Sequence, residues 1–424
     1  MRPDLVVIVD GSPCLSETFV LQELLELESR GLSLVVMALA WPQEQEVVQQ
    51  DELTRLRAPV EYVPALTGAQ RRLAARAAHA ALLLEGRGRY LAAISGIVKS
   101  PDHTRARLDR AALVAHRLVR LGRPSLYIHF ACRPGTIGRF AARLAGVPYA
   151  LSCRGEDIWL TPGDELRRKL EDARVVLSST REGFSELERH AAGATPVRLI
   201  HHGTEIPAAP ARRMPPAGAP RILTVGRLVP KKGHDLLIGA AAVLREQRTA
   251  FELRIAGDGP EWSRLQRLVH ALELGDRVVF LGPLTPAEVQ DELAAASAFA
   301  LARRRTPDGD RDGLPDVVLE AMARELPVVS TTLADVAEAV QDGVSGLLVP
   351  PEDPGALAVA LQRVLGDPEL AAALGRGAGD RVRSSFDRRD TLPRVFATLA
   401  QAGLVRPDTA TAVKDTDRVV QRAA

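Results

Sequence analysis

A loop in the second half of the chain combines three cations with two bounding glycines, in the order Gly226-Arg227-Leu228-Val229-Pro230-Lys231-Lys232-Gly233. An apolar, strand-like segment ends at Gly226, and a helix-like segment starts just after Gly233. Glycine lets a backbone approach a ligand closely, arginine can hold a phosphate in a fork, and lysine supplies a mobile point charge. The loop therefore suits a diphosphate, although a merely solvated loop fits the spacing equally well.

Further on, the stretch 308–323 carries carboxylates ahead of a predicted helix and inside it. Asp312 and Glu320 have seven residues between them, and the Gly313-Leu314-Pro315 turn leads its backbone N–H groups into the helix. A helix N-terminus can receive phosphate, and a carboxylate further into the helix can accept hydrogen bonds from ribose hydroxyls. An acidic surface loop is the alternative interpretation.

Other short motifs offer competing chemistry. Asp308-Gly309-Asp310 matches the D-x-D motif of a divalent-metal site. The cationic loop nearby disfavours this interpretation. Gly257-Asp258-Gly259 begins a dinucleotide fingerprint, but Trp262 stands where that fingerprint needs Gly or Ala. The sequence therefore does not indicate a dehydrogenase. Three scattered cysteines are too few for a disulfide framework or a zinc site: Cys14, Cys132 and Cys153.

Strand-like and helix-like segments alternate through both halves of the chain. Leu5–Val9 is an uninterrupted apolar run, typical of a parallel strand buried on both faces, and a helix and the strand Leu32–Leu39 follow it. The alternation resumes after the Pro-rich segment 207–220, and the preceding His201-His202 is interpreted as a hinge turn. We expect an α/β protein with two Rossmann-like parallel-sheet domains, whose strands end at a ligand-binding cleft.

Charge is balanced overall but not locally. The chain has 55 Lys and Arg against 53 Asp and Glu, so no global field selects nucleic acid. Between residues 67 and 143, however, fifteen Lys or Arg meet three acidic residues. This stretch is either a set of solvated helix faces or a surface for anionic lipid or a pyrophosphate-bearing acceptor. With no signal peptide or span-length apolar run, we expect a cytoplasmic protein with at most peripheral contact on the inner membrane face.

Taken in order, three motifs resemble the donor-binding half of family 4 retaining glycosyltransferases, which have the GT-B fold: the Gly226–Gly233 loop, the carboxylate pair ending in Glu320-Ala321-Met322-Ala323, and Gly346-Leu347-Leu348-Val349-Pro350. Pro13-x-x-Ser16-Glu17-Thr18-Phe19 is similar to the opening loop of transferases that build bacterial surface polysaccharides, of the colanic-acid and exopolysaccharide type. Ile128-His129-Phe130 and Gly155-Glu156-Asp157 match further segments of the family. The resemblance covers about residues 5–400.

This resemblance implies a role for each matched position. Arg227 and Lys232 would neutralise the nucleotide diphosphate in place of a metal, Glu320 would hold the ribose, and no cofactor is expected. Asp312, where the family usually has Glu, would contact the donor sugar. The donor pocket would be completed by Gly226, Gly313, Leu314, Pro315, Asp316 and Glu338. The acceptor side would include Gly11, Ser16, Glu17, Thr18, His129 and Asp157.

The implied domains are an acceptor-binding domain at 1–208 and a nucleotide-sugar-binding domain at 209–385. A C-terminal helix at 386–403 would pack back on the first domain, and 404–424 would be a disordered tail.

Three positions depart from the family pattern. Arg154 replaces a common His and could bind an anionic acceptor or the departing phosphate. Glu325 replaces a Gly after the Ala-Met-Ala segment, and Asp335 falls in a normally Gly-rich turn, where a carboxylate beside phosphate is hard to reconcile.

Several functions therefore stay open. The first is metal-independent, retaining transfer of a sugar from a nucleotide-diphosphate sugar to a hydroxyl of a glycan or lipid-linked acceptor, in bacterial surface polysaccharide biosynthesis. The others are transfer to a small soluble acceptor, a catalytically silent scaffold, or a sugar phosphorylase.

Overall fold

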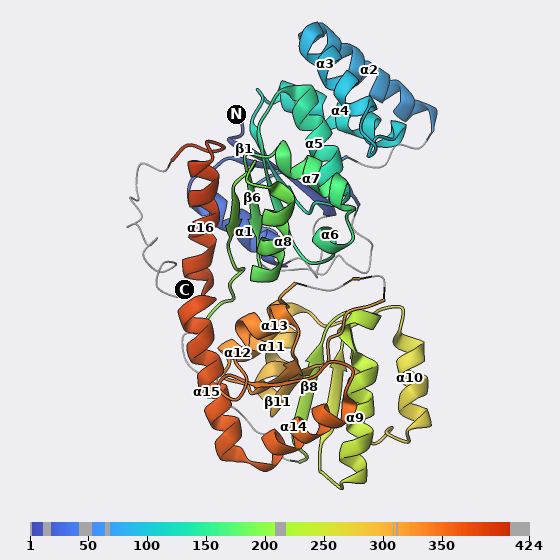
Figure 1. Ribbon diagram of the computed structural model, residues 1–424, viewed down its shortest axis with the longest axis vertical. Coiled ribbons are helices and arrows are strands. Elements are labelled where there is room, and N and C mark those ends of the chain that lie inside the picture. The colour runs from blue at the N-terminus through green and yellow to red at the C-terminus, as the bar shows by residue number, and fades with distance from the viewer. Residues whose placement is uncertain are drawn as a thin grey trace.

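The computed structural model describes residues 2–11, 18–41, 53–63, 68–207, 218–307, 309–310 and 313–407. These residues form two parallel-sheet domains, one above the other in Figure 1, with long C-terminal helices running along one side. The expectation of two Rossmann-like domains is thereby confirmed. The candidate residues Ser16, Glu17 and Asp312, the first Asp of the D-x-D motif and the tail beyond residue 407 lie outside the described residues.

The N-terminal domain is built on a seven-stranded sheet in which every neighbouring pair is parallel. In spatial order its strands are β3 (Val60–Tyr62), β2 (Leu34–Ala40), β1 (Leu5–Gly11), β4 (Ser125–His129), β5 (Tyr149–Cys153), β6 (Val175–Ser178) and β7 (Val197–Leu199). Its helices are α1 (Thr18–Ser29), α2 (Ala69–Glu85), α3 (Arg87–Val98), α4 (Arg105–Arg120), α5 (Arg133–Ala145), α6 (Glu156–Trp159), α7 (Gly163–Glu171) and α8 (Arg181–Ala191), with the short turn η3 (Leu53–Arg55).

The central strand β1 shows why the sheet is covered on both faces. Val6 and Ile8 pack into the core beneath α4 and α5, whereas Leu5, Val7 and Val9 pack into the core on the α1 side. Successive strand residues point to opposite faces, so a continuous apolar run is buried only between two helical layers.

The C-terminal domain repeats this design with six strands in the order β10 (Val278–Gly282), β9 (Glu252–Ala256), β8 (Arg221–Val225), β11 (Ala298–Leu301), β12 (Val328–Thr331) and β13 (Leu347–Val349). Its helices are α9 (His234–Glu246), α10 (Trp262–Ala271), α11 (Pro286–Ala295), α12 (Asp316–Ala323), α13 (Ala334–Ala339), α14 (Pro354–Gly366) and α15 (Pro368–Ser385), with η4 (Pro230–Lys232) ahead of α9. None of the described helices, in either domain, combines the length and apolar character that a bilayer span requires.

The chain returns to the N-terminal domain through its last helix, α16 (Arg388–Gln401), which lies beside that domain in Figure 1. Phe396 and Leu399 of α16 belong to the same buried cluster as β1, and Leu404 is buried in it as well. The segment that leads into α16 runs beside the segment that leaves the N-terminal domain, and the Thr204 N–H donates to the Phe386 carbonyl at 2.8 Å. Gly203 is required at this crossing, since a Cβ there would overlap the backbone of Arg388.

We expect Leu399→Ala to lower the free energy of unfolding by about 2–5 kcal/mol, because it empties a fully buried position in the N-terminal core. Val359→Ala on α14 is the matched control, since Val359 is 52% exposed and its truncation changes stability by only about 0.5 kcal/mol. Denaturant unfolding measures both. Equal effects of the two substitutions would contradict the assignment of α16 to that core.

Candidate functional site

The cationic loop lies at the carboxyl end of β8, where η4 turns the chain into α9. Gly233 has a φ of +66°, and a Cβ there would overlap the Ala302 carbonyl oxygen, so only glycine fits this turn. The methylenes of Lys232 run past Gly226, where a Cβ would lie 3.5 Å from the Lys232 Cδ. The loop therefore holds the stem of Lys232 against the end of a buried strand.

The three cations of this loop differ in their partners. The Lys231 ammonium is 3.0 Å from the Asp310 carboxylate, so much of its charge is already neutralised. The Arg227 side chain is exposed and forms no ion pair with any described residue. Behind the loop, burial lowers the pKa of His234 to about 4, and its Nε2–H donates to the Arg227 carbonyl at 3.3 Å. A neutral histidine thus braces the loop.

Basic side chains from both domains converge on Asp316, the first residue of α12. The His202 Nε2 lies 2.7 Å from the Asp316 Oδ1. Burial favours the neutral acid, but the hydrogen bond and electrostatic attraction of His202, with the positive charges of Arg154 and Lys232, outweigh it, so that the pKa of Asp316 is lowered. The domains also touch beside this point, because a Cβ on Gly313 would lie 3.6 Å from the Gly155 nitrogen. The segments implicated in the sequence on either side of the cleft are therefore brought together.

Arg154 enters this seam from a buried cluster at the carboxyl ends of β1, β4 and β5. One Nη donates to Glu23, and the guanidinium carbon lies 3.9 Å from the centre of the Phe19 ring. Glu23 also accepts a hydrogen bond from the Tyr127 hydroxyl at 2.7 Å. The Nε and the other Nη of Arg154 are buried and have no hydrogen-bond partner among the described residues. The arginine is therefore rigidly held and retains donor capacity.

Two residues expected on the acceptor side lie beneath the surface of the seam. His129 is fully buried against Tyr127, and burial lowers its pKa to about 4. The Asp157 carboxylate accepts backbone N–H groups from Ala131 and, at 2.5 Å, from Arg154. These contacts position the loops that follow β4 and β5. Gly11 ends β1, and Thr18 begins α1, on either side of the undescribed segment 12–17.

The two remaining carboxylates implicated in donor binding occupy different settings. Glu320 lies four residues after Asp316 on the same face of α12, and its Oε2 accepts from the Gln290 amide at 2.8 Å. Glu338 on α13 reaches the other domain, because its carboxylate accepts from the Arg181 N–H at 2.7 Å and lies 2.5 Å from the His201 Nε2. Leu314 and Pro315 are buried where the chain enters α12.

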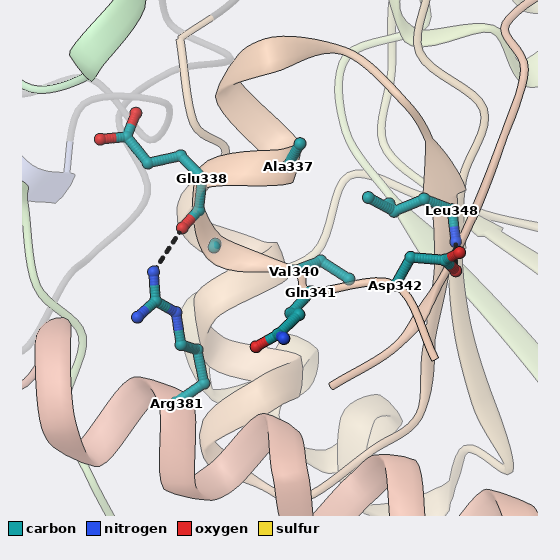
Figure 2. Close-up of a pocket in the computed structure, with 8 residues that line it drawn as sticks. Ala337, Glu338, Val340, Gln341, Asp342, Leu348 and Arg381 are labelled. Atoms are coloured by element: carbon teal, nitrogen blue, oxygen red, sulfur yellow. Dashed lines mark hydrogen bonds between the residues drawn. The ribbon is translucent and has the colours of Figure 1, made fainter. Parts of the chain in front are cut away.

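A surface hollow of about 390 Å³ is lined by α13, the segment that follows it, Leu348 of β13 and Arg381 of α15. Figure 2 shows the Glu338 side chain directed away from this hollow, while its carbonyl accepts from Arg381 at 2.8 Å. Within the described residues, no three His, Cys, Asp or Glu side chains gather as a metal site.

The departures from the family pattern are resolved by their surroundings. Asp335 pairs with the fully buried Arg303, so its carboxylate neutralises an arginine inside the protein. The sequence led us to expect that the negative charge of Asp335 would repel a bound phosphate. Because Arg303 neutralises this charge, that repulsion is reduced. Glu325 has a φ of +58° at the turn after α12 and pairs with Arg383 at 3.1 Å.

Sequence reasoning missed the residues that connect these groups. Glu23 and Tyr127 look like ordinary helix and strand residues, and nothing in their spacing indicates that they hold Arg154. His201-His202 was interpreted as a hinge turn, whereas each imidazole pairs with a carboxylate of the other domain. The one available signal was Arg303, a charged residue directly after the apolar strand segment 298–302.

We expect Arg303→Met and Asp335→Ala each to destabilise the protein by about 3–5 kcal/mol, because each removes the oppositely charged partner of a buried charge. The double variant should lose less than the sum of the two. Arg383→Met is the control, since the Arg383 side chain is 44% exposed and its pairing with Glu325 contributes about 1 kcal/mol or less. Denaturant unfolding provides the values, and additivity of the two buried substitutions would contradict the coupling.

Stability should fall as the pH is lowered from about 6.5 to 4, because the unfolded chain binds protons on His129 and His234 that the folded protein excludes. Both pKa values are depressed, so this stabilisation is present above pH 6.5 and is lost towards the folded pKa near 4. Denaturant unfolding across this pH range should show that the free energy of unfolding depends less steeply on pH in the double variant His129→Gln with His234→Gln than in the wild type. An unchanged slope in that variant would overturn the assignment.

Residues 207–381 match the family described as Glycosyl transferases group 1. The putative colanic acid biosynthesis glycosyltransferase WcaL of Escherichia coli is 39% identical over 189 residues, which cover 44% of this chain and 46% of that protein. The chain thus spans about half the length of the curated relatives it matches.

The fold is also similar to those of solved structures, including the following two. Each alignment covers 94% of this chain and 99% of the solved chain. HepE of Anabaena, in complex with UDP and glucose, gives a TM-score of 0.71 at 19% identity. Sucrose-phosphate synthase of Thermosynechococcus elongatus gives 0.72 at 22% identity. The chain has the GT-B fold, and its residues 207–381 match the Glycosyl transferases group 1 family.

Proposed function

We propose that the protein is a retaining, metal-independent glycosyltransferase. It would move a sugar from a nucleotide-diphosphate sugar to a hydroxyl of a glycan or lipid-linked acceptor in bacterial surface polysaccharide biosynthesis. The observation that carries this proposal is the convergence of Arg154, His202 and Lys232 on Asp316, at the seam between the two domains. Such a concentration of basic side chains suits a ligand with more than one negative charge.

On the donor side, Lys232 and Arg227 bind the diphosphate. Lys232 is held against Gly226 at the end of β8, and Arg227 is exposed on the same loop. The N-terminus of α12 adds the backbone N–H groups of Gly313, Leu314 and Asp316 and the positive end of a helix dipole. Glu320, one turn further along, accepts hydrogen bonds from the ribose. The UDP in the HepE structure supports a nucleoside diphosphate as the leaving group.

Catalysis on this proposal is mainly electrostatic. Breaking the sugar–phosphate bond places growing charge on the diphosphate and leaves an oxocarbenium-like sugar. Fixed cations at the place where charge develops stabilise that transition state more than the ground state. The acceptor hydroxyl attacks from the face that the diphosphate leaves, and a phosphate oxygen takes its proton. The anomeric configuration of the product, read by NMR, tests this retention.

The acceptor side is the carboxyl edge of the N-terminal sheet. Trp41 follows β2, its indole is 63% exposed, and it stacks on Tyr62 with ring centres 4.0 Å apart. An exposed aromatic face of this kind suits the C–H surface of a sugar ring. Similarity to WcaL, named for colanic acid biosynthesis, supports a glycan or lipid-linked acceptor over a small soluble one.

Titration with UDP, GDP, ADP and dTDP, each with and without EDTA, tests the proposal by thermal shift and calorimetry. One nucleotide should bind and raise the melting temperature by mass action, and EDTA should leave its affinity unchanged. Loss of binding in EDTA would contradict metal independence. Binding of none would favour the silent scaffold, and turnover with inorganic phosphate alone would favour a phosphorylase.

In the same titrations, Lys232→Ala should weaken nucleotide binding, while the melting temperature of the free protein stays within a few degrees of the wild type. In an assay of sugar transfer, the same substitution should abolish activity. Lys231→Ala is the matched control, because Lys231 is one residue away and already paired with Asp310. It should keep most of the activity. Full activity in Lys232→Ala would remove the diphosphate role assigned to this loop.

A further inference from the structure

The basic stretch between residues 67 and 143 separates into two groups. On α4 and α5, four of the arginines are engaged within the protein. Arg117 pairs with Glu61 at 2.6 Å, Arg139 and Arg143 pair with Asp172, and the Arg110 guanidinium donates to the Val63 carbonyl. Arg110 and Arg117 hold α4 to the edge of the sheet, whereas Arg139 and Arg143 join α5 to the end of α7. These four side chains are already engaged within the protein.

The cations on α2 and α3 are different. Arg72, Arg76, Arg87, Arg89 and Lys99 are exposed and form no ion pair with any described residue. The one acidic residue of these two helices, Glu85, is paired with Arg123 at 3.2 Å. Both helices belong to a hairpin that projects from the N-terminal domain on the side away from the C-terminal domain (Figure 1). The hairpin therefore presents uncompensated positive charge.

The same hairpin exposes apolar side chains in a regular pattern. On α2, Ala75, Ala78 and Leu82 are buried. The opposite side presents Leu73, Ala77, Ala80 and Leu84 at intervals of three and four residues, with Leu73 68% and Leu84 88% exposed. On α3, Leu91 and Val98 lie seven residues apart and are about half exposed. A helix whose outward face is this apolar lacks the polar surface expected of a solvated helix.

We propose that the α2–α3 hairpin docks on an anionic lipid bilayer. Exposed leucines beside unpaired arginines match the two components of an interfacial membrane helix, which are apolar insertion and attraction to acidic headgroups. The excess of positive charge disfavours a second copy as the partner, because two hairpins would repel each other. This docking does not depend on the transferase activity. It narrows the membrane contact expected from the whole basic stretch to two helices.

Sedimentation of the purified full chain with vesicles tests the proposal. The chain should bind vesicles of phosphatidylcholine with phosphatidylglycerol, bind pure phosphatidylcholine much more weakly, and dissociate as salt is raised. Arg72→Gln with Arg76→Gln should lower the partition coefficient by about fivefold for each arginine. Arg267→Gln on α10, an exposed arginine without a described ion pair, is the control and should bind like the wild type.

The apolar part is tested by Leu73→Glu with Leu84→Glu, which should abolish vesicle binding. Val359→Glu, at a comparably exposed position on α14, should have no effect. Both residues of the test pair are exposed, so the melting temperature and nucleotide affinity should stay unchanged, which separates this result from a failure of the donor site. Binding that ignores lipid charge or survives both substitutions would overturn the proposal. So would a dimer in solution that the same leucine substitutions dissolve.

Discussion

One carboxylate at the interface between the two domains, Asp316, faces basic side chains from both sides. Arg154 comes from the N-terminal domain, His202 from the connecting segment and Lys232 from the C-terminal domain. Like charges repel, so the Arg154 and Lys232 side chains alone would disfavour the approach of the two domains. Asp316 offsets that repulsion. A diphosphate carries more negative charge than one carboxylate, and a seam already arranged around an anion is suited to bind it.

Buried charge elsewhere is compensated in the same way. Arg303 meets Asp335, and Arg154 meets Glu23, each pair with little exposure to solvent. Removing one partner of such a pair is strongly destabilising, whereas replacing both is tolerated. The unusual Asp335 therefore has a structural partner in Arg303. A compensated Asp335 gives less support to the interpretation of the chain as a silent scaffold, which the departures at Arg154, Glu325 and Asp335 had left open.

Much of the fold follows from patterns that depend only on local sequence. The apolar run at Leu5–Val9 could be recognised as a doubly covered strand, and the loop ending at Gly233 as a strand-to-helix turn, because both signals lie within a few residues. The pairing of Arg154 with Glu23 could not be anticipated, since 131 residues separate them. The same holds for His202 and Asp316. These residues become neighbours only because the ends of different strands and helices meet in the fold. No periodic pattern in the sequence connects them, so residue spacing does not predict the contacts.

The basic stretch shows how one composition serves two structural purposes. Arg110 on α4 donates to the carbonyl groups of Leu39 and Val63, at the carboxyl ends of β2 and β3, and so fixes α4 to the sheet. The α2–α3 hairpin rests on α4 and α5 through Leu82 and Ile97, which are buried in the same core cluster. The exposed hairpin is therefore coupled by packed side chains and hydrogen bonds to the sheet edge that carries Trp41. A surface that holds the hairpin would also fix the direction in which the acceptor side of the cleft opens.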